Sequence, residues 1–122
     1  MKKKTKILIK LRPDIRTVAE HINNIRHILG TSISDLGNIF DVSRQAIYNW
    51  LAESSIPRQE KLARIIALSM IADQLKQANI SRARSLFKMK TFSGRSLMDL
   101  VVSGEYTNEH VSALINEATI KR

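Results

Sequence analysis

The stretch Ser32–Leu51, SISDLGNIFDVSRQAIYNWL, has the pattern of two short helices joined by a tight turn. Ser32 is suited to begin the first helix, because its hydroxyl can accept a hydrogen bond from a free backbone N–H. Asp35, three residues later, completes an acidic version of the capping box. Three apolar residues recur at helical spacing and form one edge: Leu36, Ile39 and Phe40. We predict that this helix ends at Asp41.

Ser43 is the corresponding cap for the second helix. The residues that face inward are Ile47, Trp50 and Leu51. Those left facing outward are Arg44, Gln45, Tyr48 and Asn49. Helices this short are marginal alone, so their apolar edges require further helices on either side. The chain is therefore predicted to be all-α, with a helix-turn-helix bundle of about five helices followed by short C-terminal helices.

The segment Ile25–Trp50, IRHILGTSISDLGNIFDVSRQAIYNW, resembles the helix-turn-helix of the phage-repressor (Cro-like, XRE) family. The matching positions are Ile25, Arg26, Gly30, Ser32, Leu36, the run Val42–Gln45, Ile47, Asn49 and Trp50. Four positions depart from the family pattern: Ile33, Gly37, Asp41 and Leu51. The resemblance implies a DNA-binding protein whose second helix, residues 43–51, enters the major groove.

By resemblance, three residues match the base-facing positions of the family: Arg44, Gln45 and Asn49. Their chemistry suits the task, because arginine grips guanine O6 and N7 and amides pair with adenine N6 and N7. Five residues are placed to hold phosphates: Ser32, Ser43, Tyr48, Arg58 and Lys61. The expected partner is double-stranded DNA. One recognition helix reads only a few base pairs, so we also expect a homodimer.

Composition and the absence of known motifs narrow the classes of protein to which this chain can belong. The 122 residues are 43% hydrophobic and include no cysteine, which excludes disulfides and thiolate metal sites and fits the cytoplasm. No apolar segment is long enough to span a membrane. The sequence contains no glycine-rich phosphate loop and no HExxH, GxSxG or CxxC motif. We therefore predict no enzymatic activity, no cofactor and no metal.

The net charge of +9 is unevenly distributed. Residues 1–13 carry six basic groups and no acid, and residues 80–98 carry five basic groups and no acid. Residues 14–79 hold seven groups of each sign, and residues 99–122 hold four acids and two bases. The two basic blocks are therefore the expected sites of attraction to a polyanion, and the acidic end is a candidate protein-facing surface.

Residues 1–12 are predicted to be a basic arm or a short strand. TKILIKL, residues 5–11, alternates with the period of a β-strand. We favour pairing of this strand with its copy in a second subunit. An extended arm along DNA and disorder up to Arg12 are the alternatives.

Residues 13–78 are predicted to form the DNA-binding domain. Its first helix is expected to begin at Pro13 and Asp14 and to end at Gly30, with His21 and His27 at the surface or boundary. A long helix should run from Pro57 to about Gln77 and be apolar nearly all round. One of its faces is expected to close the helix-turn-helix core, through Leu62, Ile65 and Ile66. The other needs a partner in the C-terminal region or a second subunit, through Leu68, Met70 and Ile71.

Residues 79–122 are predicted to be a helical dimerisation or partner-binding region. We expect a helix within 79–95 whose apolar side packs on the long helix. The alternative adds phosphate contacts from its basic residues, Arg82, Arg84, Lys88 or Lys90. Ser96 and Thr107 are expected to cap two further helices. FSGRSLMDLVVSGE, residues 92–105, is similar to the toxin-binding region of certain Xre-type antitoxins.

The function predicted first is a sequence-specific transcriptional regulator that reads DNA with helix 43–51. The alternative is an antitoxin-like adaptor that binds a partner protein through its C-terminal region, with DNA binding as autoregulation. A third reading, an architectural DNA protein without sequence preference, would make Arg44, Gln45 and Asn49 dispensable and the basic tail essential.

Overall fold

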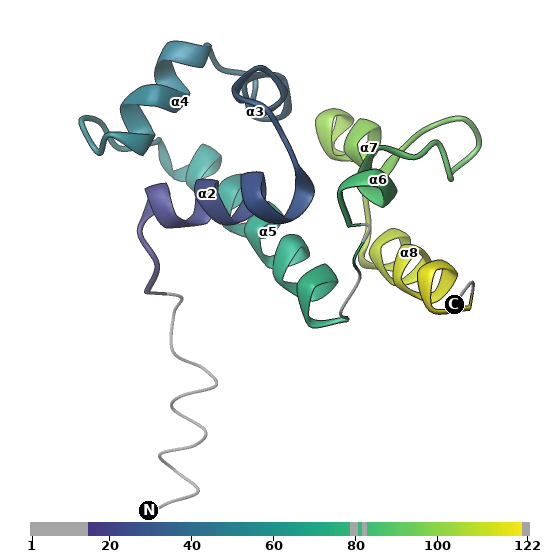
Figure 1. The fold of residues 1–122 in the computed structure, drawn as a ribbon. Coiled ribbons are helices and arrows are strands. Elements are labelled where there is room, and N and C mark those ends of the chain that lie inside the picture. The colour runs from purple at the N-terminus through teal and green to yellow at the C-terminus, as the bar shows by residue number, and fades with distance from the viewer. Residues whose placement is uncertain (1–14, 79–80, 82, 121–122) are drawn as a thin grey trace, which may run out of the picture.

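The structure, a computed structural model, describes residues 15–78, 81 and 83–120, and the predicted strand and arm at residues 1–12 lie outside that part. Seven helices and no strand occur in the described residues, which confirms the all-α prediction. They are α2 (Val18–Leu29), α3 (Ile33–Phe40), α4 (Arg44–Leu51), α5 (Gln59–Gln77), α6 (Ala83–Lys88), α7 (Leu97–Ser103) and α8 (Asn108–Ile120). Figure 1 shows α2 to α5 gathered on one side and α6 to α8 on the other. No described helix is long and apolar enough to cross a membrane.

Helices α3 and α4 form the predicted helix-turn-helix. The capping box at the start of α3 is complete, because Asp35 N–H donates to Ser32 Oγ at 3.0 Å and Ser32 N–H donates to Asp35 Oδ2 at 2.9 Å. The turn residue Asp41 adopts the left-handed conformation, with φ of 56°. A Cβ on Gly37 would lie 2.9 Å from the Val42 carbonyl oxygen, so a glycine here lets the turn lie close against α3.

Helix α2 begins later than predicted. Residues 15–17 are not helical, and the helix starts at Val18 rather than at Pro13 and Asp14. The reason is a second capping box, in which Glu20 N–H donates to Thr17 Oγ1 at 3.1 Å and Thr17 N–H donates to Glu20 Oε1 at 2.7 Å. Gly30 ends the helix with φ of 68°, as predicted.

Helix α5 holds the C-terminal end of α3 in place. Its Lys61 ammonium donates to the Phe40 carbonyl at 2.7 Å, and its Arg64 guanidinium donates to the Ile39 carbonyl. Cations favour a helix C-terminus, because the last carbonyls have no partner within the helix. These two bonds therefore fix α3, and with it the adjoining α4, on the long helix.

A polar network joins α2 to α5 and corrects the prediction for His21. This residue is buried with 1% of its surface exposed, and its Nδ1 lies 2.8 Å from Ser69 Oγ. Asn24 donates to Ser69 Oγ at 3.0 Å and to Asp73 Oδ1 at 2.9 Å. Arg16 extends the network through a 2.7 Å ion pair with Asp73. His21 can be buried because Ser69, on the opposite helix, supplies a hydrogen-bonding partner.

The helix predicted within residues 79–95 is shorter than expected. Among the described residues of this segment only Ala83–Lys88 is helical, and it packs mainly against α2 and α7 rather than along α5. The chain then turns through Ser93 and Gly94, both with positive φ. Phe92 and Arg95 exchange backbone hydrogen bonds of 2.9 and 3.1 Å across this turn. The helix has already ended at Lys88, and the positive φ at Ser93 and Gly94 is incompatible with a right-handed helix through the rest of the segment.

The last two helices begin at their predicted caps. Ser96 Oγ accepts the Asp99 N–H at 3.0 Å, and Thr107 Oγ1 accepts the His110 N–H at 3.3 Å. Ten of the largest side chains in the core come from both halves of the chain and belong to one continuous apolar cluster: Ile22, Ile25, Leu29, Leu36, Phe40, Ile47, Ile65, Leu75, Phe87 and Leu114. On the second face of α5, Leu68 and Ile71 are buried, whereas Met70 is 52% exposed.

Candidate nucleic-acid interface

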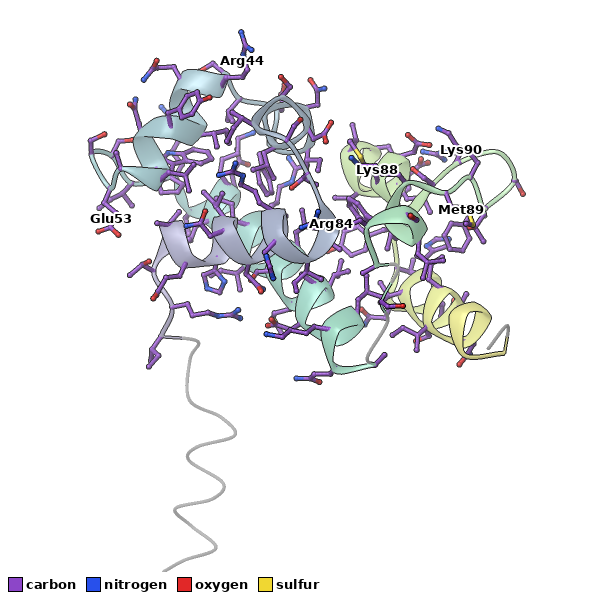
Figure 2. The ribbon with its side chains drawn as sticks, in the orientation of Figure 1. Arg44, Glu53, Arg84, Lys88, Met89 and Lys90 are labelled. Carbon is purple, nitrogen blue, oxygen red and sulfur yellow. The ribbon has the colours of Figure 1, made fainter. Side chains whose placement is uncertain are left out.

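Helix α4 presents one polar face to solvent. Arg44 and Gln45 are exposed, Tyr48 is 53% exposed, and Asn49 is half-buried. Arg44 lies at the outer edge of the molecule (Figure 2) and has no ion pair with any described residue. Gln45 Nε2 donates to Asn49 Oδ1 at 3.0 Å, one helical turn along. Together these side chains offer a guanidinium and two amides on one exposed surface.

The opposite face of α4 fixes this presentation. Ile47 has no exposed surface and Trp50 only 6%, which confirms that the tryptophan belongs to the core. Ser43 caps the helix, because its Oγ accepts the Ala46 N–H at 3.1 Å. A short helix held by its core face and its cap presents polar groups in a defined orientation, as base recognition requires.

The structure places the five predicted phosphate-binding residues in different settings. The Ser32 and Ser43 hydroxyls accept capping bonds, although each can still donate its own hydrogen. Tyr48 and Arg58 are exposed, and Arg58 is the N-cap residue of α5. Lys61 is half-buried and bonded to Phe40, so its ammonium has a structural role. Phosphate contact by all five residues stays a prediction.

The second basic block makes contacts within the protein. Arg84 Nε and Nη2 donate to the His27 carbonyl at 3.3 and 3.0 Å. Lys88 donates to the Gly30 carbonyl at 3.2 Å and lies 3.5 Å from Asp35. The two cations of α6 therefore bind the C-terminal end of α2 and the first turn of α3. They join the C-terminal helices to the helix-turn-helix (Figure 2).

The loop after α6 is fixed in the same way. Lys90 donates to Asp99 at 2.7 Å, and Arg95 pairs with Glu105 at 2.6 Å and donates to Ser103 at 2.9 Å. The hydrogen bond from Lys90 and the N–H of Ser96 lower the pKa of Asp99 from 3.8 to about 2. Hydrogen bonds from Arg95 and Ser103 likewise lower the pKa of Glu105.

Asp35 is the acid beside the junction, the contact of Arg84 and Lys88 with the end of α2 and the first turn of α3. Burial alone would raise its pKa, but the Ser32 N–H and the positive charge of Lys88 outweigh this effect and lower it. The carboxylate is therefore ionised at neutral pH, and its charge is compensated by a helix N-terminus and by Lys88. The sequence indicated the role of Asp35 in the cap but not its contact with Lys88.

Comparison with known proteins gives one group of relatives. The chain is 28% identical over 108 residues to the Mycobacterial cidal antitoxin MbcA of Mycobacterium bovis and of Mycobacterium tuberculosis, with 84% of this chain and 91% of that protein aligned. No protein-family description matches the chain. No solved structure matches it. The chain is thus similar, at modest identity but over most of its length, to an antitoxin.

Proposed function

We propose that this chain is an antitoxin-like protein, which binds and neutralises a partner protein through its C-terminal region, residues 79–122. The supporting observation is the extent of the likeness to the MbcA antitoxin. An alignment over 84% of a 122-residue chain cannot be confined to the helix-turn-helix and must include part of the C-terminal region. The antitoxin-like segment at residues 92–105 lies within that region.

Two exposed apolar residues define the surface to probe. Among the described residues of the C-terminal region, Met89 and Val102 are the large apolar side chains with substantial exposure, each 42%. Met89 lies directly after α6 and Val102 lies on α7. Apolar side chains near the centre of an interface contribute most to affinity when they are desolvated. We therefore place part of the partner-binding surface at these two residues.

The test is co-expression with the product of the reading frame adjacent to the gene. That product, induced alone, is expected to arrest growth, and this chain is expected to restore it. Val102→Asp should weaken the rescue, whereas Ile56→Asp, at an 85% exposed apolar residue before α5, should not. Arrest that persists with the wild-type chain, or an adjacent product that neither arrests growth nor co-purifies with it, would exclude this function.

A second function, sequence-specific DNA binding through α4, is favoured by a separate observation. The polar face of this helix is exposed while its apolar face is buried against the core. Selection from a random duplex library is expected to enrich a two-fold symmetric site, and the triple variant Arg44→Ala, Gln45→Ala, Asn49→Ala should lose the enrichment. Salt-sensitive binding without enrichment, unchanged in the variant, would instead indicate an architectural protein that holds phosphates only.

The same DNA function includes a homodimer, because two half-sites supply the specificity that one short helix lacks. Sedimentation at micromolar concentration should show a dimer at least when DNA is present. A monomer both with and without DNA would argue against it.

A further inference from the structure

A polar hollow lies where α2 ends and α6 crosses it. Its volume is about 490 Å³, and its lining comes from residues far apart in sequence: Asn23, Arg26, His27, Gly30, Thr31 and Arg84. None of these residues is acidic. The hollow is separate from the polar face of α4, and Arg84 is its one lining residue that the sequence offered as an alternative phosphate contact.

Two arginines give the hollow a positive charge. Arg26 is exposed and has no ion pair or side-chain hydrogen bond with a described residue. Arg84 reaches the hollow over Gly30, where a Cβ would lie only 2.7 Å from Arg84 Cδ. Two of its five N–H donors bind the His27 carbonyl, so three remain for a ligand.

The backbone around the hollow does not oppose an anion. The C-terminal end of a helix normally carries partial negative charge on its unpaired carbonyls. Here Arg84 binds the His27 carbonyl and Lys88 binds the Gly30 carbonyl. The two contacts neutralise the end of α2 and leave an excess of positive charge.

Thr31 supplies an independent observation. The residue is 5% exposed, and its hydroxyl is the one buried side-chain polar atom among the described residues without a hydrogen-bond partner. Buried hydroxyls in native proteins nearly always have a partner. Thr31 borders the hollow, so a change of its χ1 rotamer is the movement that would let the hydroxyl donate to an oxygen bound there.

We propose that this hollow binds one phosphate of the DNA backbone, with Arg26 and Arg84 as charged donors and the Thr31 hydroxyl as a third donor. DNA is the expected source because Thr31 directly precedes Ser32, the cap of α3 and a predicted phosphate contact. The inference rests on the proposed DNA binding and extends it. It makes the C-terminal region, through Arg84, part of the DNA-binding surface.

The test combines protein variants with DNA from which single charges have been removed. The full chain is measured against its selected duplex and against duplexes that carry one neutral methylphosphonate at successive positions. Wild-type protein should lose about tenfold in affinity at one position per half-site. Arg26→Gln should lose a similar factor on unmodified DNA, show a smaller further loss than wild type at that position because Arg84 and Thr31 remain, and reduce the salt slope by about 1.

Two further variants separate this site from general electrostatics. Lys76→Gln removes an exposed charge from the last turn of α5 and should leave the positional profile unchanged. Thr31→Val should reduce the loss of affinity that the methylphosphonate causes, at the same DNA position as Arg26→Gln does. It should not lower the thermal midpoint of the protein. If Arg26→Gln and Thr31→Val both affect the same phosphate, that phosphate is the one bound in the hollow.

The contrary outcomes are distinct. Variants that bind DNA normally, with the wild-type profile and salt slope, would overturn the inference and leave the DNA-binding function intact. Saturable binding of inorganic phosphate that depends on Arg26, with no methylphosphonate effect, would assign the hollow to a free anion and overturn the DNA assignment. A chain that enriches no duplex would contradict the DNA-binding function itself, and the inference would fall with it.

Discussion

The second basic block has the higher net charge in the sequence, but the polar face of α4 has the more available cation in the structure. Residues 80–98 carry five positive charges and no negative one, yet each of the four described cations in this block bonds to another part of the protein. Residues 14–79 are neutral overall, yet Arg44 on α4 is exposed and has no ion pair with a described residue. Local net charge therefore does not identify the groups that are available to a partner.

The difference has a physical basis. The carbonyls at the end of α2 and the acids of α3, α7 and the loop that follows α7 give the block internal partners. On the outer face of α4, Arg44 has no ion pair and no side-chain hydrogen bond with a described residue, while Ile47 and Trp50 fill the core side of the helix. A cation with an internal partner contributes to the fold and offers an anion only the donors that remain, as Arg84 does, whereas a cation without a partner offers all of them.

The largest expected effect concerns the polar face of α4. The triple variant Arg44→Ala, Gln45→Ala, Asn49→Ala should lose about 100-fold or more in affinity for the selected site, since each paired base contact contributes about 1–3 kcal/mol. Its urea midpoint should stay close to that of the wild type, because these side chains make few contacts with the core. Unchanged affinity in a folded variant would show that α4 does not read bases.

The next largest effect is on stability and tests the packing of the Arg84 side chain on Gly30. Gly30→Ala should destabilise the protein by about 1–2 kcal/mol, because φ is 68° and a Cβ would clash with the Arg84 side chain. Urea unfolding followed by circular dichroism measures the change. Gly94→Ala is the matched control, since its φ is 84° but nothing lies within 4 Å of its Cβ position. Equal losses in both variants would mean that the packing of Arg84 on Gly30 contributes nothing.

A smaller effect of opposite sign is expected at Thr31. Thr31→Val keeps the shape and removes the unpartnered hydroxyl, so the free energy of unfolding should rise by about 1 kcal/mol. The same variant should bind its DNA site more weakly if the hollow holds a phosphate. Loss of stability on this substitution would show that the hydroxyl has a partner in solution.

The smallest effect concerns pH and the loop after α6. The pKa of Asp99 is lowered from 3.8 to about 2, so its bonds to Lys90 and Ser96 favour the ionised carboxylate. Their contribution is present above pH 3.8 and is lost as the pH falls toward 2. The side chain is 39% exposed, so solvent screening limits the contribution to about 0.5 kcal/mol. Asp99→Asn should be less stable than wild type at pH 6, and the difference should disappear at pH 2. A difference that persisted at pH 2 would have another cause.

The sequence predicted features whose cause is local. The caps at Ser32, Ser43 and Ser96 and the helix ends at Gly30 and Asp41 all depend on neighbours within a few positions, and the structure confirms them. The buried apolar faces of α3 and α4 likewise follow from helical periodicity.

Features that depend on distant partners were not predictable from the sequence. His21 is buried because Ser69 lies opposite it, and Arg84 bonds to His27 because α6 crosses the end of α2. The hollow beside Thr31 likewise exists only after these segments pack together. Gly30 was the one local signal, but a helix-ending glycine does not reveal which side chain lies against it.

The most direct test is growth rescue by two variants of the chain. Each variant is co-expressed with the adjacent gene product from a promoter that lacks the selected DNA site. In the proposed division, α4 reads DNA and the C-terminal region neutralises the partner protein. The triple variant Arg44→Ala, Gln45→Ala, Asn49→Ala should therefore restore growth as well as the wild type, and Val102→Asp should not. A folded triple variant that fails to restore growth, or a Val102→Asp variant that succeeds fully, would contradict this division.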